Sequence, residues 1–197
     1  MASELDDRGV AGVRERKRAH SRAATVDAAL ALFATRGYDE VTVADICEAA
    51  QIAPRTFFRY FPSREDVLAE PARQMAARLT AAISTAPEQL GDAGTLDHAL
   101  RSVGGYVVDH RDRLALFLRV AAESAASRPS PFLHLADRER DVAERLLARR
   151  GALPPADWRT RLVVARGVAT FRVWLDDVIA RDVPDPLGHL DELLATR

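Results

Sequence analysis

Residues 54–64 (PRTFFRYFPSR) hold the side chains best suited to chemistry, because cationic, hydroxyl and aromatic groups recur there at helical spacing. Arg55 and Arg59 are four residues apart, as are Thr56 and Tyr60, so each pair lies on one side of a helix. Arginine can bind guanine or phosphate through two hydrogen bonds, threonine can contact a base, and the tyrosine hydroxyl can bind a phosphate. The pattern predicts a nucleic-acid surface.

The helix that carries these groups also needs an inward face, which Phe57 and Phe61 supply. We expect this pair to close a core against Ile46 and Phe33 from neighbouring helices, which turns the arginines outward. Phe58 falls between the two faces, where it can meet a thymine methyl group or pack inside.

Local signals predict the elements around this segment. Apolar spacing predicts a first helix over residues 14–37, ending at a glycine that suits a C-cap. Thr42 and Asp45 have the spacing of a capping box, which opens a short second helix. Residues 51–54 form a break, and Pro54 suits the first turn of a third helix. Together these elements form a helix-turn-helix module.

Two flanking features add positive charge to the module. Residues 14–22 contain five basic residues and one acid, which fits an adjoining phosphate backbone. Arg64 follows the third helix and is expected to clamp a phosphate beside the same groove. It lies in the first turn of a helix that extends to about residue 84 and bends at Pro71, which cannot donate a backbone hydrogen bond.

Residues 14–70 resemble the DNA-binding domain of the tetracycline-repressor (TetR) family. The resemblance rests on residues 28–33, 36–38, 41–46 and, above all, 54–66. It implies a helix-turn-helix module followed by a helical domain that binds an effector and dimerises. It assigns DNA contacts to Thr42, Val43, Arg55, Thr56, Phe58, Arg59, Tyr60 and Arg64.

Two positions of the turn depart from the family pattern. Gln51 stands where the family usually has glycine, so a left-handed backbone there is strained by about 1 kcal/mol. Ala53 stands where serine is common and lacks an N-cap hydrogen bond worth about 1 kcal/mol. Neither change removes the motif.

Whole-chain composition limits the alternatives. The 28 Lys and Arg residues are balanced by 29 Asp and Glu residues, so any nucleic-acid site must be local. The single cysteine, Cys47, excludes an intramolecular disulfide and a cysteine-cluster zinc site, and fits a reducing compartment. Because neither a signal peptide nor a run of 18 apolar residues is present, we expect a cytoplasmic protein.

Other kinds of site are not expected. No two histidines share a helical face with a carboxylate, so we predict neither a metal site nor a cofactor. Ser124 and Ser127 lack a glycine-rich elbow, and no loop is built to hold a phosphate, so we predict no enzyme activity. For some residues a purely structural role is the alternative to a functional one. The paired arginines can form a solvated face, Cys47 can be a small buried residue, and His110 can be a helix cap.

The remaining chain predicts further helices at about 95–109, 111–127, 136–150, 156–181 and 186–196, and no strand. The expected fold class is all-α with about nine helices. The expected domains are a disordered leader over residues 1–13, a DNA-binding domain over 14–70 with its motif at 42–61, and an effector-binding and dimerisation domain over 71–197.

The helix over 156–181 is apolar around much of its circumference, so it needs neighbours on two sides. The resemblance implies that it pairs, with the helix over 186–196, against a second copy of the chain. A homodimer would place two recognition helices about one duplex turn apart, or slightly further, and would require a near-palindromic operator.

The apolar residues of the C-terminal domain are also expected to enclose a cavity for an apolar or aromatic effector with one or two polar groups. The expected lining residues are Leu100, Val103, Tyr106, Val107, Phe117, Phe132, Val164, Val168, Phe171 and Trp174. The predicted function is that of a repressor released from its operator by this effector. An activator, or a DNA-tethered adaptor whose helical domain binds a protein partner, remains an alternative.

Overall fold

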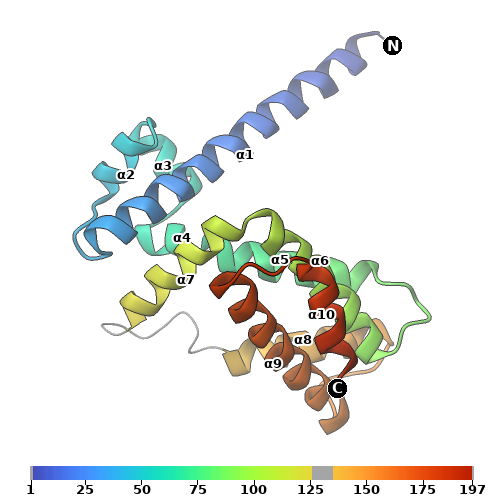
Figure 1. Cartoon of the computed structure of the whole chain (residues 1–197). Helices are drawn as coiled ribbons and strands as arrows, with labels where there is room; N and C mark the ends of the chain where they lie inside the picture. Colours follow the sequence, from blue (N-terminus) through green and yellow to red (C-terminus); the bar gives the residue numbers. More distant parts are fainter. Residues whose placement is uncertain (1, 126–134, 197) are drawn as a thin grey trace. The chain divides into compact units, whose positions relative to one another are not determined.

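The computed structural model describes the backbone of residues 2–125 and 135–196, and the side chains of residues 15–124 and 137–196. Within these ranges all regular elements are α-helices, ten in number, and no strand occurs (Figure 1). The predicted all-α class is therefore confirmed. None of the described helices combines the length and apolar character needed to cross a membrane.

The chain forms two compact units. The first comprises Met1–Glu70 and Leu116–Ala126, and the second comprises Pro71–Ala115 and Ser127–Arg197. The expected C-terminal domain covers residues 71–197, whereas this division groups Leu116–Ala126 with the first unit, and the expected domain bounds stay a prediction. Helical spacing predicts that this segment has an apolar face but does not reveal which core the face joins.

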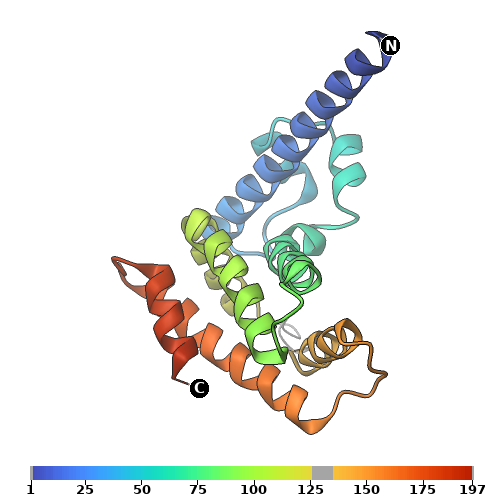
Figure 2. The ribbon, with the colours of Figure 1, turned by 90° about the vertical axis from the view of Figure 1, so that its right-hand side faces the viewer.

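Four helices belong wholly to the first unit: α1 (Ala2–Arg36), α2 (Val43–Ala49), α3 (Pro54–Tyr60) and α4 (Arg64–Leu68). The expected disordered leader over residues 1–13 is wrong from residue 2 onward, because α1 begins there and continues for 35 residues (Figure 2). Gly9 and Gly12 each cost about 1 kcal/mol in a helix interior, but the residues around them are compatible with a helix. At its other end, α1 stops at Gly37, whose φ of +86° is that of a C-cap glycine.

The helix expected after Ser63 is in fact two helices, α4 and α5 (Glu70–Thr85), with Ala69 between them. Pro71 lies in the first turn of α5, where its missing N–H breaks no hydrogen bond. A continuous helix would bring the proline ring against the carbonyl of Val67. The expected bend is therefore an interruption two residues before the proline, and it raises the number of helices from nine to ten.

Large apolar side chains form the core of the first unit. Leu30 and Phe33 of α1, Ile46 of α2, and Phe57 and Phe61 at α3 are each at most 1% exposed. The rings of Phe57 and Phe61 lie 5.9 Å apart between centroids. The predicted inward face of α3 is confirmed, and its packing holds α3 and α2 against α1.

The second unit contains most of α5, α6 (Asp92–Asp109), the start of α7 (Arg111–Ala125), α8 (Leu135–Arg149), α9 (Trp158–Ala180) and α10 (Pro186–Ala195). Leu96 of α6, Val164 and Trp174 of α9, and Leu190 of α10 are fully buried in it. A Cβ at Gly167 would lie 2.5 Å from Cδ2 of Leu96, so this glycine permits the close approach of α9 to α6. Figure 2 shows α9 and α10, in orange and red, side by side.

Arginines close the ends of several helices in the second unit. Arg149 donates hydrogen bonds to the carbonyls of Ala86, Pro87 and Leu90, in the loop that follows α5. Arg111 donates to the carbonyls of Val178 and Arg181, where α9 ends. The guanidinium groups thereby hydrogen-bond carbonyls at helix ends and in the loop, where helical hydrogen bonding stops.

Candidate nucleic-acid interface

A short turn with an unusual backbone presents α3. Gln51 has a φ of +52°, so its backbone is left-handed, the case in which the sequence analysis expects strain. Ala53, the N-cap residue of α3, makes no side-chain cap hydrogen bond, and Pro54 occupies the first turn. Since local capping is weak, the position of α3 depends on the packing of Phe57 and Phe61 beneath it.

The outward face of α3 gathers four of the predicted residues. Arg55, Phe58 and Arg59 are exposed, and Thr56 is half-buried beside them. The Phe58 side chain is 56% exposed, so of its two expected positions, outward or packed inside, it takes the outward one. These side chains offer two guanidinium groups, a hydroxyl group and an apolar ring to an incoming ligand.

Tyr60 does not lie on that outward face, contrary to the prediction. It is 7% exposed, and its ring packs edge-on against Phe61 at 6.4 Å between centroids. Its hydroxyl accepts a hydrogen bond from Nη2 of Arg59 at 3.4 Å. Hydrogen bonds from the Ser21 side chain and from Arg59 lower the pKa of Tyr60. Spacing alone paired Tyr60 with Thr56, whereas the structure turns it toward α1.

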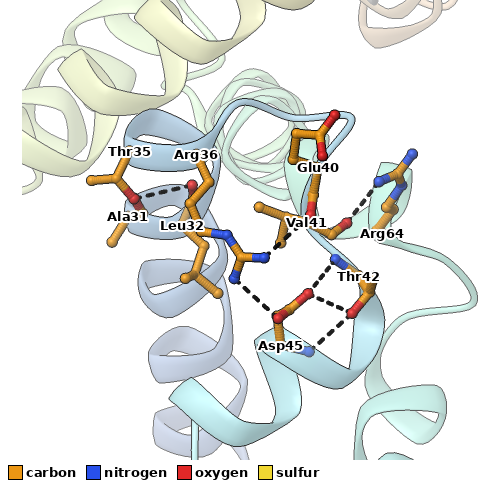
Figure 3. A network of polar contacts seen from close by, with 9 residues as sticks. All are labelled: Ala31, Leu32, Thr35, Arg36, Glu40, Val41, Thr42, Asp45 and Arg64. Atoms are coloured by element: carbon orange, nitrogen blue, oxygen red, sulfur yellow. Dashed lines mark hydrogen bonds and ion pairs between the residues drawn. The ribbon is translucent and has the colours of Figure 1, made fainter.

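A polar network holds the start of α2 (Figure 3). Oγ1 of Thr42 accepts from the amide of Asp45 at 3.2 Å, and the Asp45 carboxylate accepts from the amide of Thr42 at 2.8 Å. The predicted capping box is thus confirmed. Nη1 of Arg36 donates to Asp45 at 3.0 Å, and these hydrogen bonds, led by that of the Thr42 side chain, lower the pKa of Asp45 to about 2. Thr42 is exposed and Val43 is half-buried.

Arg64, the predicted phosphate clamp, hydrogen-bonds backbone carbonyls of its own chain. Its Nη1 donates to the carbonyls of Tyr38, Asp39 and Val41, at 3.1, 3.3 and 2.7 Å (Figure 3 shows the last of these contacts). Its guanidinium also stacks over the Tyr38 ring at 4.6 Å. These contacts bind Arg64 to the loop between α1 and α2. Arg64 thereby positions α2, and its contact with phosphate stays a prediction.

The sequence analysis missed a second positioning arginine. Arg22 of α1 donates from Nε and Nη2 to the two carboxylate oxygens of Glu70, at 3.0 and 2.8 Å, and from Nη1 to the carbonyl of Tyr60 at 3.0 Å. Its guanidinium lies 4.5 Å from the centroid of the Phe61 ring. Glu70 is 6% exposed. The pair joins α1, the end of α3 and the first residue of α5, and no local pattern signals it because Arg22 and Glu70 are 48 residues apart.

The arginines of the first unit therefore fall into two groups. Arg22, Arg36 and Arg64 each bind a carboxylate or backbone carbonyls. By contrast, Arg55 and Arg59 form no ion pair with any residue whose side chain the structure describes. Arg55 and Arg59 are therefore available to a ligand that carries negative charge, as are the exposed Arg16 and Arg18 of α1.

The residues expected to line an effector cavity lie mostly in the core of the second unit or on α7. Phe132 lies outside the described residues. Seven of the other nine are buried, namely Leu100, Val103, Tyr106, Val107, Phe117, Val164 and Trp174, whereas Val168 and Phe171 are half-buried. Crevices of about 350 Å³ and 390 Å³ occur beside Arg149 and beside His189, and none of the expected residues lines them.

Polar groups surround one of these residues. The Tyr106 hydroxyl donates to Oε1 of Gln74 at 2.5 Å, and the Arg78 guanidinium lies 4.5 Å from the centroid of its ring. The His110 ring stacks on Tyr106 at 4.3 Å, and His110 is the C-cap of α6, as predicted. Gln74 and Arg78 were missed because they lie on α5, about 30 residues before Tyr106.

Two further predictions concern Cys47 and α9. Cys47 is 5% exposed, and burial raises the pKa of its thiol, so it is the small buried residue expected. On α9, one apolar side is buried in the second unit, whereas Trp158, Leu162 and Val173 on the other are 58%, 41% and 51% exposed. Among the described side chains, no group of three His, Cys, Asp or Glu residues is arranged to hold a metal ion.

Comparisons with known proteins agree with this arrangement. Residues 26–70 match the model of the family described as bacterial regulatory proteins, tetR family. The HTH-type transcriptional regulator TcmR of Streptomyces glaucescens is 31% identical over 168 residues, which cover 82% of this chain and 74% of TcmR. The fold resembles that of a TetR-family regulator from Streptomyces coelicolor, with a TM-score of 0.55 and 21% identity over 89% of this chain and 91% of that one. It also resembles that of GusR from Salmonella enterica, with a TM-score of 0.57 and 19% identity over 89% and 92%.

Proposed function

The chain belongs to the TetR family of bacterial transcriptional regulators, and on this basis we propose that it represses transcription by binding operator DNA. The observation that carries the proposal is the exposed face of α3, where Arg55 and Arg59 have no ion pair with the described residues. A buried apolar face holds this surface rigidly outward. The protein would act in the cytoplasm, where operator DNA lies.

In the proposed complex, α3 enters the major groove. Arg55, at the start of α3, donates two hydrogen bonds to a guanine edge, and Thr56 and Phe58 contact neighbouring bases, for example through a thymine methyl group. Thr42 and Val43 at the start of α2 approach the backbone of the duplex. Arg64 acts indirectly, because its bonds to the preceding loop fix the position of α2.

We further propose that the regulator is a homodimer joined through α9 and α10. The exposed apolar side of α9, with Trp158 and Leu162, supports this because solvent exposure of such a stripe is unfavourable. Twofold symmetry would place the two copies of α3 about 34–36 Å apart or slightly further, which requires a near-palindromic operator.

Effector control completes the proposal. Tyr106, Gln74 and Arg78 supply polar groups beside the apolar residues Leu100 and Val103. This combination suits an apolar or aromatic molecule with one or two polar groups. Effector binding would favour a conformer in which the two recognition helices no longer match the operator, and so release the DNA.

The test is a fluorescence anisotropy titration with a duplex from the chain's own upstream region, at two salt concentrations. Wild-type protein is expected to bind it more tightly than a scrambled duplex. Arg55→Ala should weaken binding to the upstream duplex by about 1–3 kcal/mol and binding to the scrambled duplex by less. Arg145→Ala, which removes an exposed charge from α8, is the matched control. An equal reduction on both duplexes would contradict base recognition by Arg55.

A further inference from the structure

One face of α1 passes through the core of the first unit and then emerges into solvent. Ala29 and Thr25 on this face are buried, and Arg22, one turn earlier, is bound to Glu70. Arg18, a further turn earlier, is exposed. Spacings of three and four residues place these positions in one line along the helix. The face that packs inside the module at Arg22 is therefore free to meet a ligand at Arg18.

The end of α3 lies beside this part of α1. The hydrogen bond from Arg22 to the carbonyl of Tyr60, 3.0 Å long, joins the two helices, and the Tyr60 hydroxyl accepts from Arg59. On the side of α1, Ser21 and Arg18 contribute with Arg59 to lowering the pKa of Tyr60. Two arginines from helices far apart in the sequence thus converge on one tyrosine.

No carboxylate among the described side chains forms an ion pair with either of these arginines. Arg16 and Lys17, next to Arg18, are also exposed, and Glu15 is the single acidic residue over 15–20. Nearby like charges repel each other unless an anion lies between them. The surface is therefore complementary to a group that carries negative charge and several hydrogen-bond acceptors.

We propose that Arg18 of α1 and Arg59 of α3 together bind one phosphate group of the DNA backbone. The planar fork of a guanidinium donates two parallel hydrogen bonds to phosphate oxygens, which leaves an oxygen for the second arginine. The inference rests on the proposed DNA binding, and it adds to the interface a contact from outside the helix-turn-helix motif. Because a phosphate carries no base identity, the contact strengthens binding to all sequences alike.

The first experiment compares full-length Arg18→Gln with Arg145→Gln, which removes the same charge from an exposed position of α8. Binding to a labelled upstream duplex and to a scrambled duplex of equal length is measured over a salt series. Arg18→Gln is expected to weaken binding to both duplexes by the same factor, roughly fivefold to tenfold. The slope of log K against log salt should fall by about 0.9 for each phosphate that the variant no longer neutralises. Arg145→Gln should match the wild type.

A second experiment localises the contact. Single phosphates of the duplex are replaced one at a time by uncharged methylphosphonates. At the phosphate shared by Arg18 and Arg59, the wild-type protein should lose the contacts of both arginines, and so more affinity than Arg18→Gln loses on unmodified DNA. Arg18→Gln should lose only the remaining contact of Arg59 there. Arg18→Lys, which keeps the charge on the same helix, should retain most of the affinity for unmodified DNA.

The outcomes separate this inference from the proposed function. If the wild type binds DNA but Arg18→Gln matches Arg145→Gln, the inference is overturned and the proposed function stands. A weakening confined to the upstream duplex would also overturn it, because a phosphate contact does not discriminate between sequences. Failure of the wild type to bind either duplex would overturn both. Equal midpoints of thermal unfolding for the two variants show that folding is not the cause of any difference.

Discussion

Arginines have different roles in the two units of the molecule. In the second unit, Arg149 and Arg111 direct their guanidinium groups at backbone carbonyls and so close a loop and a helix end. In the first unit, Arg22 and Arg64 do the same, but Arg55 and Arg59 form no ion pair with the described residues. A nucleic-acid surface in a chain of net charge −1 therefore depends on which arginines are left without an acidic partner, and only secondarily on how many there are.

The largest effect is expected at Arg22. Arg22→Met leaves the buried carboxylate of Glu70 without its bidentate partner and should lower the free energy of unfolding by about 3 kcal/mol, measured by urea denaturation. Arg36→Met is the matched control, because its ion pair with Asp45 is exposed and worth at most about 1 kcal/mol. Equal destabilisation of the two variants would contradict the distinction between an arginine bound to a buried carboxylate and one bound to an exposed carboxylate.

A smaller effect, on both stability and DNA binding, is expected at Arg64. Arg64→Ala releases three carbonyls of the loop before α2, so the free energy of unfolding should fall by about 1–2 kcal/mol, and DNA affinity should fall with it. Unfolding is followed by urea denaturation, and affinity by anisotropy. If the variant is as stable as the wild type but binds every DNA sequence more weakly, the result would show that Arg64 contacts phosphate directly and does not act by positioning α2.

The smallest effect concerns pH. The pKa of Asp45 is lowered from 3.8 to about 2 in the folded chain by its hydrogen bonds to Thr42 and Arg36. A lowered pKa means that ionised Asp45 stabilises the fold above pH 3.8 and that this contribution is lost as pH falls toward 2. Urea denaturation over this range should show a shallower acid limb for Asp45→Asn than for the wild type. Identical pH profiles would mean that Asp45 does not stabilise the start of α2.

Much of the first unit could be predicted from short-range patterns. The capping box at Thr42 and the C-cap at Gly37 each depend on residues within about four positions. The inward pair Phe57 and Phe61 follows equally from helical spacing. These features agree with the structure because local sterics and hydrogen bonding decide them.

The features that the sequence analysis missed share a physical cause: they depend on contacts between segments far apart in the chain. Arg64 binds a carbonyl 26 residues earlier in the chain, and Arg22 binds a carboxylate 48 residues later. Tyr60 is buried, and its backbone carbonyl accepts a hydrogen bond from Arg22 of α1. Helical spacing contains no information about such tertiary contacts. Helical spacing likewise does not signal the grouping of Leu116–Ala126 with the first unit.

The sequence by itself determined the helical class, the limits of α2 and α3, the outward placement of Arg55 and Arg59, and the family. Each of these follows from residue types at fixed short spacing. Only the tertiary structure decided which arginines hold the module together and which remain available to DNA, because that choice depends on whether a carboxylate or a carbonyl from a distant segment reaches the guanidinium. For Arg18, the same packing brings α1 beside the end of α3 and thereby suggests a second contact with the DNA backbone.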